Sequence, residues 1–292
     1  GKGTTTMHRA RLGIVGGTLA LLATAAGAPA ARAQSGWGLV NMPVGVTDVS
    51  RKIYALHMMG FWICVAIAVV VFGVMIWSLI FHRRSRGAVA DVTMVHNTKV
   101  EIVWTTIPVL ILISMAVPAA NLLLKINDNT HSQLDIRVTG FQWGWQYTYV
   151  KSGVSFVSKL AYATDAARQL DSGISADSVP HYLLDADHPL VVPTGTKIRL
   201  LVTSVDVIHS WWVPDFGVKK DALPGFVNEV SFTVDPNKTG VYRGQCTELC
   251  GRDHAYMPVV VRAVSPADFA AWLQQQAAQK QAATQSAAAP AG

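Results

Sequence analysis

The segment GQCTELCGRDHAYM, residues 244–257, gathers several candidate metal ligands in a chain with only one other cysteine. Four of them follow one another at intervals of four, four and three residues: Cys246, Cys250, His254 and Met257. Two nearby cysteines outside the cytoplasm form a disulfide unless a metal holds them. Methionine is a poor zinc ligand, whereas thiolate, thioether and imidazole together favour copper. The spacing therefore favours a copper site and leaves a zinc site and a disulfide as alternatives.

A second histidine, His209, ends a predicted strand upstream, in the sequence DVIHSWW. A blue-copper site also takes one histidine from an early strand and its other ligands from a C-terminal loop, but it needs only one thiolate. Two thiolates and two imidazoles can instead hold two copper ions that share one electron. A purple copper chromophore would distinguish such a centre from a colourless zinc protein or from a disulfide.

The N-terminal region predicts export across a membrane. Two arginines and an apolar run follow Met7, and the pattern Ala-Arg-Ala ends at Ala33. A basic start, an apolar core and a small-residue cleavage pattern are typical of a signal peptide. We therefore assign residues 1–33 to upstream residues and a signal peptide, and residues 34–56 to an exported segment. A retained membrane anchor is the alternative.

Two further apolar stretches predict a membrane-spanning helix hairpin over residues 57–126. The chain is 51% hydrophobic, and residues 57–81 and 102–124 each reach the roughly 20 residues that a helix needs to cross a bilayer. The link between them is basic, with Arg83, Arg84, Arg86 and Lys99. Because basic links stay in the cytoplasm, we expect the chain after Lys125 to lie on the outer side, in agreement with the signal peptide.

Residues 127–265 change to short runs of β-forming residues separated by turn signals, which predict an all-β sandwich or barrel. The expected fold class is thus a transmembrane helix pair followed by an all-β domain. Residues 266–292 predict a helix with Ser265 as its N-cap, which fades into a low-complexity, disordered tail. Between positions 127 and 266 the chain has 12 basic and 14 acidic residues, so its net charge of +6 does not indicate a nucleic-acid partner.

The membrane segments, the β domain and the motifs HSWWVPDFGVKKDALPG and GQCTELCGRDHAYMPVVV together resemble subunit II of the haem-copper cytochrome c oxidases. The resemblance covers about residues 51–273, and the C-x-E-x-C-x3-H-x2-M pattern is specific to it. It implies that the β domain is cupredoxin-like and carries a dinuclear copper centre, called CuA. It also implies a multi-pass protein of the bacterial inner membrane, with the copper domain on the periplasmic side.

The resemblance assigns a role to each candidate ligand. Six residues would hold the two copper ions: His209, Cys246, Glu248, Cys250, His254 and Met257. The two cysteines would bridge the ions, and each histidine would bind one of them. The methionine thioether and the backbone carbonyl of Glu248 would be weak axial ligands, while the Glu248 carboxylate would face a magnesium or manganese ion at the junction with subunit I.

The run FQWGWQYTYV, residues 141–150, predicts one strand with aromatic side chains on one face. We expect most of these side chains to pack in the core. The resemblance implies that Trp143 is the surface residue through which cytochrome c delivers its electron. Gly144 and Thr148 stand where the family pattern has a tyrosine and a glutamate, so a tethered or unusual c-type donor is an alternative.

Cytochrome c usually presents a basic face, so an oxidase that receives its electrons should present carboxylates. We expect this docking surface from five aspartates of one acidic segment: Asp165, Asp171, Asp177, Asp185 and Asp187. The resemblance implies Asp206 as a sixth docking residue. For the first five, a solvated surface loop is the alternative.

Glu101 lies at the cytoplasmic start of the second membrane helix, where a carboxylate suits the helix dipole. The resemblance implies that it lies at the mouth of a proton path into subunit I. The predicted protein is a subunit of a proton-pumping cytochrome c oxidase that passes electrons to haem in subunit I, where oxygen is reduced to water. Further expected partners are subunit III, a c-type cytochrome and membrane lipid. The chain has no C-x-x-C-H motif, so we expect haem in the partner subunit only.

Two rival functions come from other classes. A quinol-oxidase subunit II keeps the fold but lacks the copper ligands, so the intact cysteine pair speaks against it. A copper-handling assembly protein would use thiols transiently and would not need two membrane helices. Retention of copper after gentle chelation would separate a carrier from an electron-transfer site.

Overall fold

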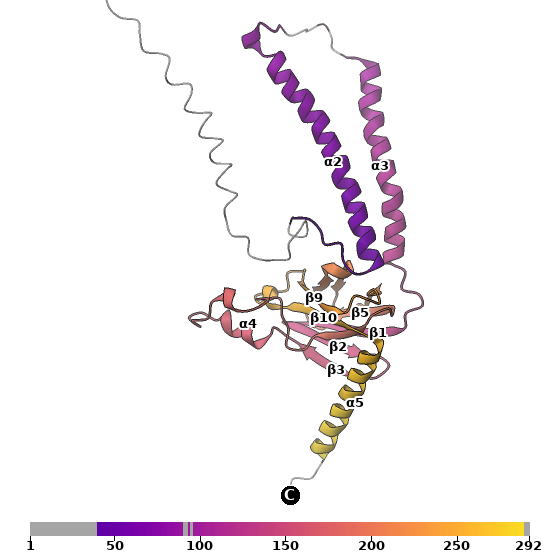
Figure 1. Cartoon of the computed structure of the whole chain (residues 1–292), viewed down its shortest axis with the longest axis vertical. Coiled ribbons are helices and arrows are strands. Elements are labelled where there is room, and N and C mark those ends of the chain that lie inside the picture. Colours follow the sequence, from indigo (N-terminus) through magenta and orange to yellow (C-terminus); the bar gives the residue numbers. More distant parts are fainter. Residues whose placement is uncertain (1–39, 90–92, 94–95, 289–292) are drawn as a thin grey trace, which may run out of the picture. The chain divides into compact units, whose positions relative to one another are not determined.

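The structure, a computed structural model, describes residues 40–89, 93 and 96–288, with side chains described up to residue 281 (Figure 1). The predicted signal peptide, residues 1–33, lies outside the described residues.

Two long helices form the predicted hairpin. Helix α2 spans Asp48–Phe81 and α3 spans Thr98–Ile126, with the short 3₁₀ turn η3 (Arg84–Arg86) after the first. Within the described part of the chain, these are the two helices long and apolar enough to cross a membrane. Helix α2 begins nine residues before the predicted apolar stretch, because Thr47 closes a capping box with Ser50.

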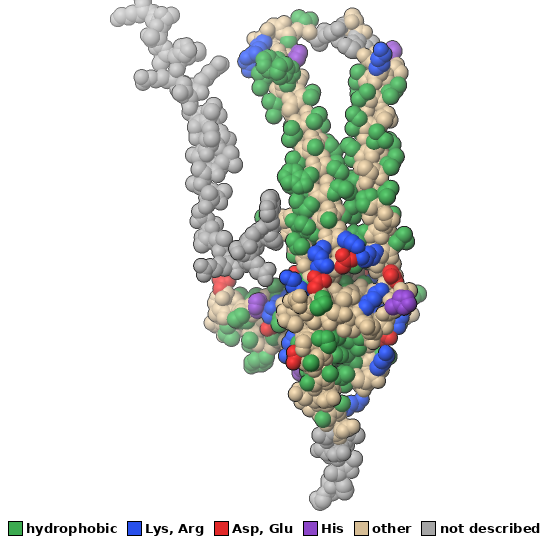
Figure 2. Space-filling model, turned by 45° about the vertical axis from the view of Figure 1, so that its right-hand side comes forward, with side chains coloured by type: hydrophobic (Ala, Val, Ile, Leu, Met, Phe, Trp, Pro, Cys, Tyr) green, Lys and Arg blue, Asp and Glu red, His purple; other side chains and the backbone are tan. Residues whose placement is uncertain are grey.

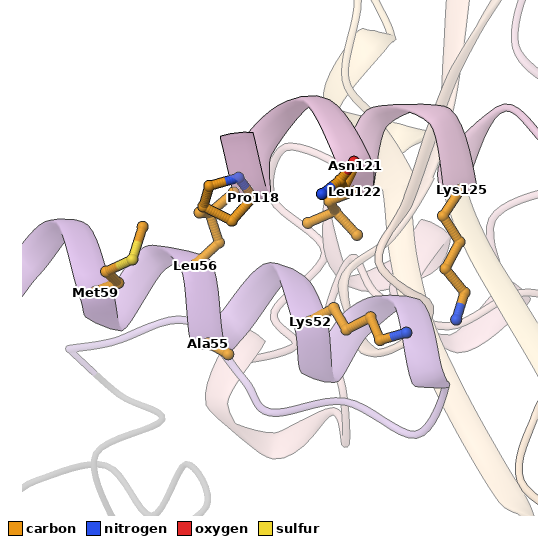
Figure 3. A pocket seen from close by; sticks show the side chains of 8 residues that line it. All are labelled: Lys52, Ala55, Leu56, Met59, Pro118, Asn121, Leu122 and Lys125. Carbon is orange, nitrogen blue, oxygen red and sulfur yellow. The ribbon is translucent and has the colours of Figure 1, made fainter. Parts of the chain in front are cut away.

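The two helices carry apolar side chains along their length and charged side chains toward both ends (Figure 2). At the end where α2 begins, Asp48 pairs with Lys52 at 3.2 Å and with Lys125. A groove of about 410 Å³ opens between the helices beside these charges (Figure 3). Its lining comes from one face of each helix: Lys52, Ala55, Leu56, Met59, Pro118, Asn121, Leu122 and Lys125. An apolar surface of this length needs lipid or a partner helix to cover it.

The β domain is a sandwich of two five-stranded sheets, as predicted. The first sheet has the order β3 (Ser155–Ser158), β2 (Gly144–Tyr149), β1 (Leu134–Phe141), β5 (Ile198–Ser204) and β8 (Asn228–Phe232). The second has the order β4 (Leu190–Pro193), β10 (Pro258–Val264), β9 (Gly240–Cys246), β6 (His209–Val213) and β7 (Val218–Ala222). The pairs β1–β5 and β4–β10 are parallel and the other pairs are antiparallel.

Short helical elements fill the connections of the sandwich. They are α4 (Tyr162–Ala167), η4 (Ala176–Ser178), η5 (Pro214–Phe216) and η6 (His254–Tyr256). Helix α5 (Pro266–Ala288) follows β10, and the Ser265 hydroxyl accepts a hydrogen bond from the Asp268 N–H at 3.1 Å, as the predicted N-cap should. The helix runs to Ala288, so the tail predicted to be disordered is helical up to that residue.

One predicted strand is wrong in its extent. The run from Phe141 to Val150 contains a hairpin turn, because β1 ends at Phe141 and β2 begins at Gly144. The aromatic residues of β2 pack in the core as expected, with Trp145, Tyr147 and Tyr149 all at most 1% exposed. The turn leaves Trp143 outside this core and half-buried.

The start of α2 is bonded to the β domain. Val46 N donates to the Asp215 carbonyl at 2.8 Å, and the Thr47 hydroxyl donates to the Phe216 carbonyl at 2.8 Å. Gly217 has φ +66, and a Cβ there would lie 2.9 Å from the Ser50 Cα, so a residue without a side chain permits this close approach. The first membrane helix is thereby fixed to the loop that follows β6.

Candidate metal centre

The site forms where two neighbouring strands of the second sheet end. His209 is the first residue of β6, Cys246 is the last of β9, and the two strands pair antiparallel. The chain then loops out and returns at Met257, whose carbonyl accepts from Cys246 N at 3.0 Å. Thr247 N donates to the Ser210 carbonyl at 3.1 Å, which ties the loop to β6. This pairing brings the distant histidine onto the cysteine loop.

The predicted ligands converge on one buried point. The Cys246 Sγ lies 3.9 Å from the Cys250 Sγ, and the latter lies 3.5 Å from the His254 Nδ1. The candidate ligand atoms of His209 and the two cysteines all lie within 4.8 Å of one another. Since a disulfide bond measures about 2.05 Å, the two thiols are not bonded to each other. The ligand set that the sequence indicated is therefore assembled by the fold.

His209 is held so that one ring nitrogen faces the thiols. Its side chain is fully buried, and its Nε2 lies 2.8 Å from the Asp206 carboxylate. Its Nδ1 is buried without a hydrogen-bond partner among the described residues. A buried polar atom without a partner is costly, and a metal ion is one partner that removes the cost. A histidine bound to a metal typically donates its other N–H to a carboxylate, as the Asp206 contact allows.

The electrostatics of the two thiols favour a bound cation. Burial raises the pKa of Cys246, but His209 and the Ser210 N–H outweigh it, so this pKa lies below the ordinary thiol value. Burial and the nearby Cys246 raise the pKa of Cys250 to about 12. Burial lowers the pKa of His209, yet Cys246 and Asp206 raise it above its ordinary value. Ionisation of Cys246 therefore opposes ionisation of Cys250, and a bound cation would favour the thiolate form of both.

The backbones of the two residues predicted as axial ligands lie beside Cys246. The Glu248 carbonyl is 3.4 Å from the Cys246 Sγ, while the residue as a whole is exposed. Met257 is 1% exposed and so contributes its thioether to a water-free interior. Thiolates, imidazoles and a thioether are the ligands that copper prefers over hard cations. The residues therefore fit the copper centre that the sequence predicted.

Trp143 lies directly against the ligand loop. Its indole Nε1 donates to the Cys250 carbonyl at 3.2 Å, and the same carbonyl accepts from the Gln142 side chain at 2.9 Å. The neighbouring Gly251 has φ +116, and a Cβ there would lie 2.9 Å from the Gln142 Nε2. The loop thus needs glycine at position 251, where the turn that contains Trp143 packs onto it. Trp143 is joined to Cys250, a candidate ligand, through a single hydrogen bond.

The six predicted docking aspartates differ in the partners that they have within the domain. Four have partners within the domain: Asp165 pairs with Arg168 at 2.6 Å, Asp185 pairs with Arg243 at 3.5 Å, Asp187 accepts from Lys159 N at 2.7 Å, and Asp206 binds His209. Asp171 and Asp177 are exposed. A docking role for the group stays a prediction.

Glu101 lies in the first turn of α3, where its carboxylate accepts from Asn97 N at 3.2 Å. This contact gives it a structural role as a helix cap. Its predicted place at a proton path stays a prediction.

Sequence reasoning missed two arginines that stack on aromatic rings at the cysteine loop. Arg252 stacks over the Trp143 ring at 5.6 Å, and Arg168 stacks over the Tyr256 ring at 4.2 Å. Arg252 is adjacent to the cysteine motif and could have been singled out for that reason. Arg168 lies about 80 positions upstream of the loop, and no local pattern indicates its contact.

The fold and the site together define a β-sandwich protein with two helices long and apolar enough to cross a membrane and a buried group of cysteines and a histidine that could hold a metal ion. Residues 134–264 match the family described as Cytochrome C oxidase subunit II, periplasmic domain, and residues 35–122 match Cytochrome C oxidase subunit II, transmembrane domain. The chain belongs to the cytochrome c oxidase subunit II family. This confirms the resemblance and the expected combination of a helix pair with a cupredoxin-like β domain.

Individual proteins are similar over most of the chain. Cytochrome c oxidase subunit 2 of Cereibacter sphaeroides is 34% identical over 245 residues, which cover 78% of this chain and 77% of that protein. The mitochondrial subunit 2 of Vigna unguiculata is 38% identical over 231 residues, which cover 79% of this chain but only 60% of that protein. The crystal structure of the periplasmic domain of subunit II of cytochrome oxidase of Bradyrhizobium japonicum is 40% identical and covers 51% of this chain and 96% of that domain, with a TM-score of 0.43.

Proposed function

We propose that the chain is the subunit of a cytochrome c oxidase that accepts electrons from a c-type cytochrome and passes them to haem in subunit I, where oxygen is reduced to water. The observation that supports this most directly is the buried cluster of His209, Cys246, Cys250 and His254, beside the thioether donor Met257. Copper bound by these residues supplies reversible one-electron storage. The family membership supports the same assignment.

In this proposal each residue of the site has a defined task. Cys246, Cys250, His209 and His254 would hold the two copper ions. The Met257 thioether and the Glu248 carbonyl would be further, weaker ligands. Because both cysteines and Met257 are at most 3% exposed, water is excluded and little reorganises when the charge of the site changes. Asp206 keeps the ring of His209 oriented through its Nε2.

Trp143 is the proposed point at which the electron is received. Its ring is half-buried, so one side reaches the surface, while its Nε1 binds the Cys250 carbonyl at 3.2 Å. A donor that touches this ring is therefore one hydrogen bond away from a ligand residue. The contact supports a short path from the surface to the thiolates.

Further parts of the proposal concern the complex. The exposed Glu248 carboxylate would bind magnesium or manganese at the junction with subunit I, and Glu101 would lie at the mouth of a proton path used in proton pumping. Subunit III and membrane lipid are the other expected partners. We place the protein in the bacterial inner membrane, with the β domain on the periplasmic side, after removal of a signal peptide.

A cysteine substitution tests the central claim. Cys250→Ser should abolish the purple two-copper spectrum and its EPR signal, because one bridging thiolate is lost. Cys64→Ser is the matched control, since Cys64 is an exposed cysteine of α2 far along the chain from the loop. An unchanged copper content and spectrum in Cys250→Ser would overturn the assignment. Copper that is released by gentle chelation of the unaltered chain would instead indicate a copper-handling protein.

A further inference from the structure

The two histidines of the site are held in different ways. His209 is fully buried and has the Asp206 carboxylate on its Nε2 at 2.8 Å. In the described part of the chain, no carboxylate is hydrogen-bonded to the ring of His254, whose Nδ1 lies 3.5 Å from the Cys250 Sγ. His254 also lies in η6, a turn of only three residues, and not in a strand. The position of its ring therefore depends on what holds the backbone of this turn.

Arg168 contacts residues on both sides of His254. Its guanidinium lies 4.2 Å from the centre of the Tyr256 ring, where a cation is attracted to the ring face, and its Nη1 lies 3.9 Å from the Asp253 carboxylate. The Arg168 and Asp253 side chains are only 24% and 17% exposed, so water and salt screen this pair less than a pair at the surface. Arg252 also lies 3.4 Å from Asp253, but it is 82% exposed and belongs to the loop, so it moves with the loop.

Arg168 is itself fixed by residues outside the ligand loop. It directly follows α4, and its backbone N–H donates to the Thr164 carbonyl at 3.1 Å. Thr164 is 1% exposed, and its hydroxyl accepts a hydrogen bond from Leu183 N at 2.9 Å. In the same segment between β3 and β4, Asp185 pairs with Arg243 of β9 at 3.5 Å. The segment can therefore hold the ligand loop against the sheet and does not simply move with it.

We propose that Arg168 is a positioning residue of the metal centre, which fixes the turn of His254 through Asp253 and Tyr256. This inference rests on the proposed function, because it concerns a ligand of the same site. Contacts on both flanks of one three-residue turn restrict its rotation as well as its displacement, which a single contact would not. Since metal–ligand distances normally vary by only ~0.2 Å, a ligand on a turn that opens often leaves the metal more readily.

Hydrogen exchange of the full-length, metal-free chain in detergent tests whether Arg168 holds the turn. The amides of His254 and Tyr256 are hydrogen-bonded within the turn, at 3.2 and 2.9 Å. Mass spectrometry of a peptide that covers residues 251–257 reports how often these bonds open. Arg168→Gln keeps most of the aliphatic stem and removes the charge, and we expect exchange of this peptide to become about 5- to 30-fold faster. A peptide from β10 should exchange as in the unaltered chain, because the loss is local.

The copper-loaded chain gives a second readout. For Arg168→Gln, we expect excess chelator to remove copper about 5- to 30-fold faster, because the turn that carries His254 opens more often by this factor. The EPR lines of the copper centre should also broaden, since a spread of His254 positions gives a spread of copper environments. Arg168→Lys keeps the charge but cannot stack as a planar group. It should therefore lie between the unaltered chain and Arg168→Gln in both measurements.

Arg137→Gln is the matched control. Arg137 is an exposed arginine of β1, in the sheet that does not carry the ligand loop, so its loss should change neither exchange of the 251–257 peptide nor copper release. If Arg168→Gln does not fold, Tyr256→Leu removes the ring that Arg168 contacts. This variant should accelerate exchange of the same peptide by about the same factor.

The outcomes separate this inference from the proposed function. Unchanged exchange of the turn peptide in Arg168→Gln, or an equal acceleration in β10, would overturn the inference, because Arg168 would then not hold the turn or would only stabilise the whole domain. Faster exchange of the turn with unchanged copper release and EPR lines would overturn it too, since the turn would not govern the metal. An unaltered chain without a two-copper chromophore would refute the proposed function, while hydrogen exchange would still decide whether Arg168 holds the turn.

Discussion

Replacing Gly140 by alanine tests whether the position of the His209 ring controls metal binding. Gly140 lies on β1, and a Cβ there would lie 2.8 Å from Cδ2 and 3.1 Å from Cγ of His209. Since favourable carbon–carbon contacts begin at about 3.5 Å, the ring must move by about 0.7 Å. The ring has little room for this shift, because it is fully buried, held by Asp206 at 2.8 Å and packed edge-on against Trp145.

The size of the effect follows from this overlap. Overpacking of a buried site costs about 1–3 kcal/mol. A ring displacement of about 0.7 Å is also larger than the ~0.2 Å by which metal–ligand distances normally vary. The substitution should therefore destabilise the metal-bound form more than the metal-free form. We expect the chelator concentration that removes half of the copper to decrease by about 5- to 150-fold.

The assay is a chelator titration of the copper-loaded chain, followed by the absorbance of the copper centre. Gly73→Ala in α2 is the control, since a Cβ at Gly73 meets nothing within 4 Å, and its titration should match that of the unaltered chain. Thermal unfolding of the metal-free Gly140→Ala variant reports the part of the cost that does not depend on metal. Copper retention equal to that of the control would refute the reasoning that the ring position limits binding.

Three further predictions concern the domain and the complex. Tyr149→Phe removes a buried hydroxyl that donates to the Val191 carbonyl at 2.6 Å and accepts from Val191 N at 3.1 Å. Denaturant unfolding should therefore show a free energy of unfolding that is lower by about 1–3 kcal/mol. No loss would mean that the Val191 backbone groups find other hydrogen-bond partners. Arg199 holds the pKa of Asp135 below its usual value through two bonds of 3.0 and 3.1 Å. Asp135→Asn should therefore lower the free energy of unfolding by up to about 1 kcal/mol above pH ~4, and this difference from the unaltered chain should shrink as the pH falls through the folded pKa. A difference that is constant at all pH values would exclude the ion pair as its source. Glu101→Ala should slow oxygen consumption by the assembled oxidase and leave reduction of the copper centre unchanged; slowed copper reduction would place its role elsewhere.

Much of the site could be predicted because the ligand loop is local in the sequence. Cys246, Cys250, His254 and Met257 lie within twelve consecutive positions, so their types and spacing already restrict the metal. His209 could be added because it was predicted to lie at the end of a strand; that prediction is wrong in detail, since the preceding strand β5 ends at Ser204 and His209 is the first residue of β6. The pairing of β6 with β9 then places it beside the loop. Local spacing and strand order were sufficient for these ligands.

The turn at Trp143 could not be predicted in the same way. The run from Phe141 to Val150 has no Asn-Gly or Asp-Gly signal, and its aromatic residues alternate as they do in one continuous strand. The structure bends it between Phe141 and Gly144, where the indole and the Gln142 amide bond the Cys250 carbonyl. That carbonyl lies more than 100 positions away along the chain. The turn therefore makes a contact that no local sequence pattern indicates.

By itself the sequence determined the class of this protein: two apolar helices with a basic link, a β domain after them, and a sulfur–nitrogen ligand set at fixed spacing. These features follow from hydrophobic length, side-chain alternation and ligand chemistry, which depend on neighbouring residues. Only the tertiary structure decided which charges are paired and which stay exposed. It paired Asp165, Asp185 and Asp206 within the domain and left Arg252 exposed over Trp143, because the strength and direction of a charge depend on what the fold brings within a few ångströms of it.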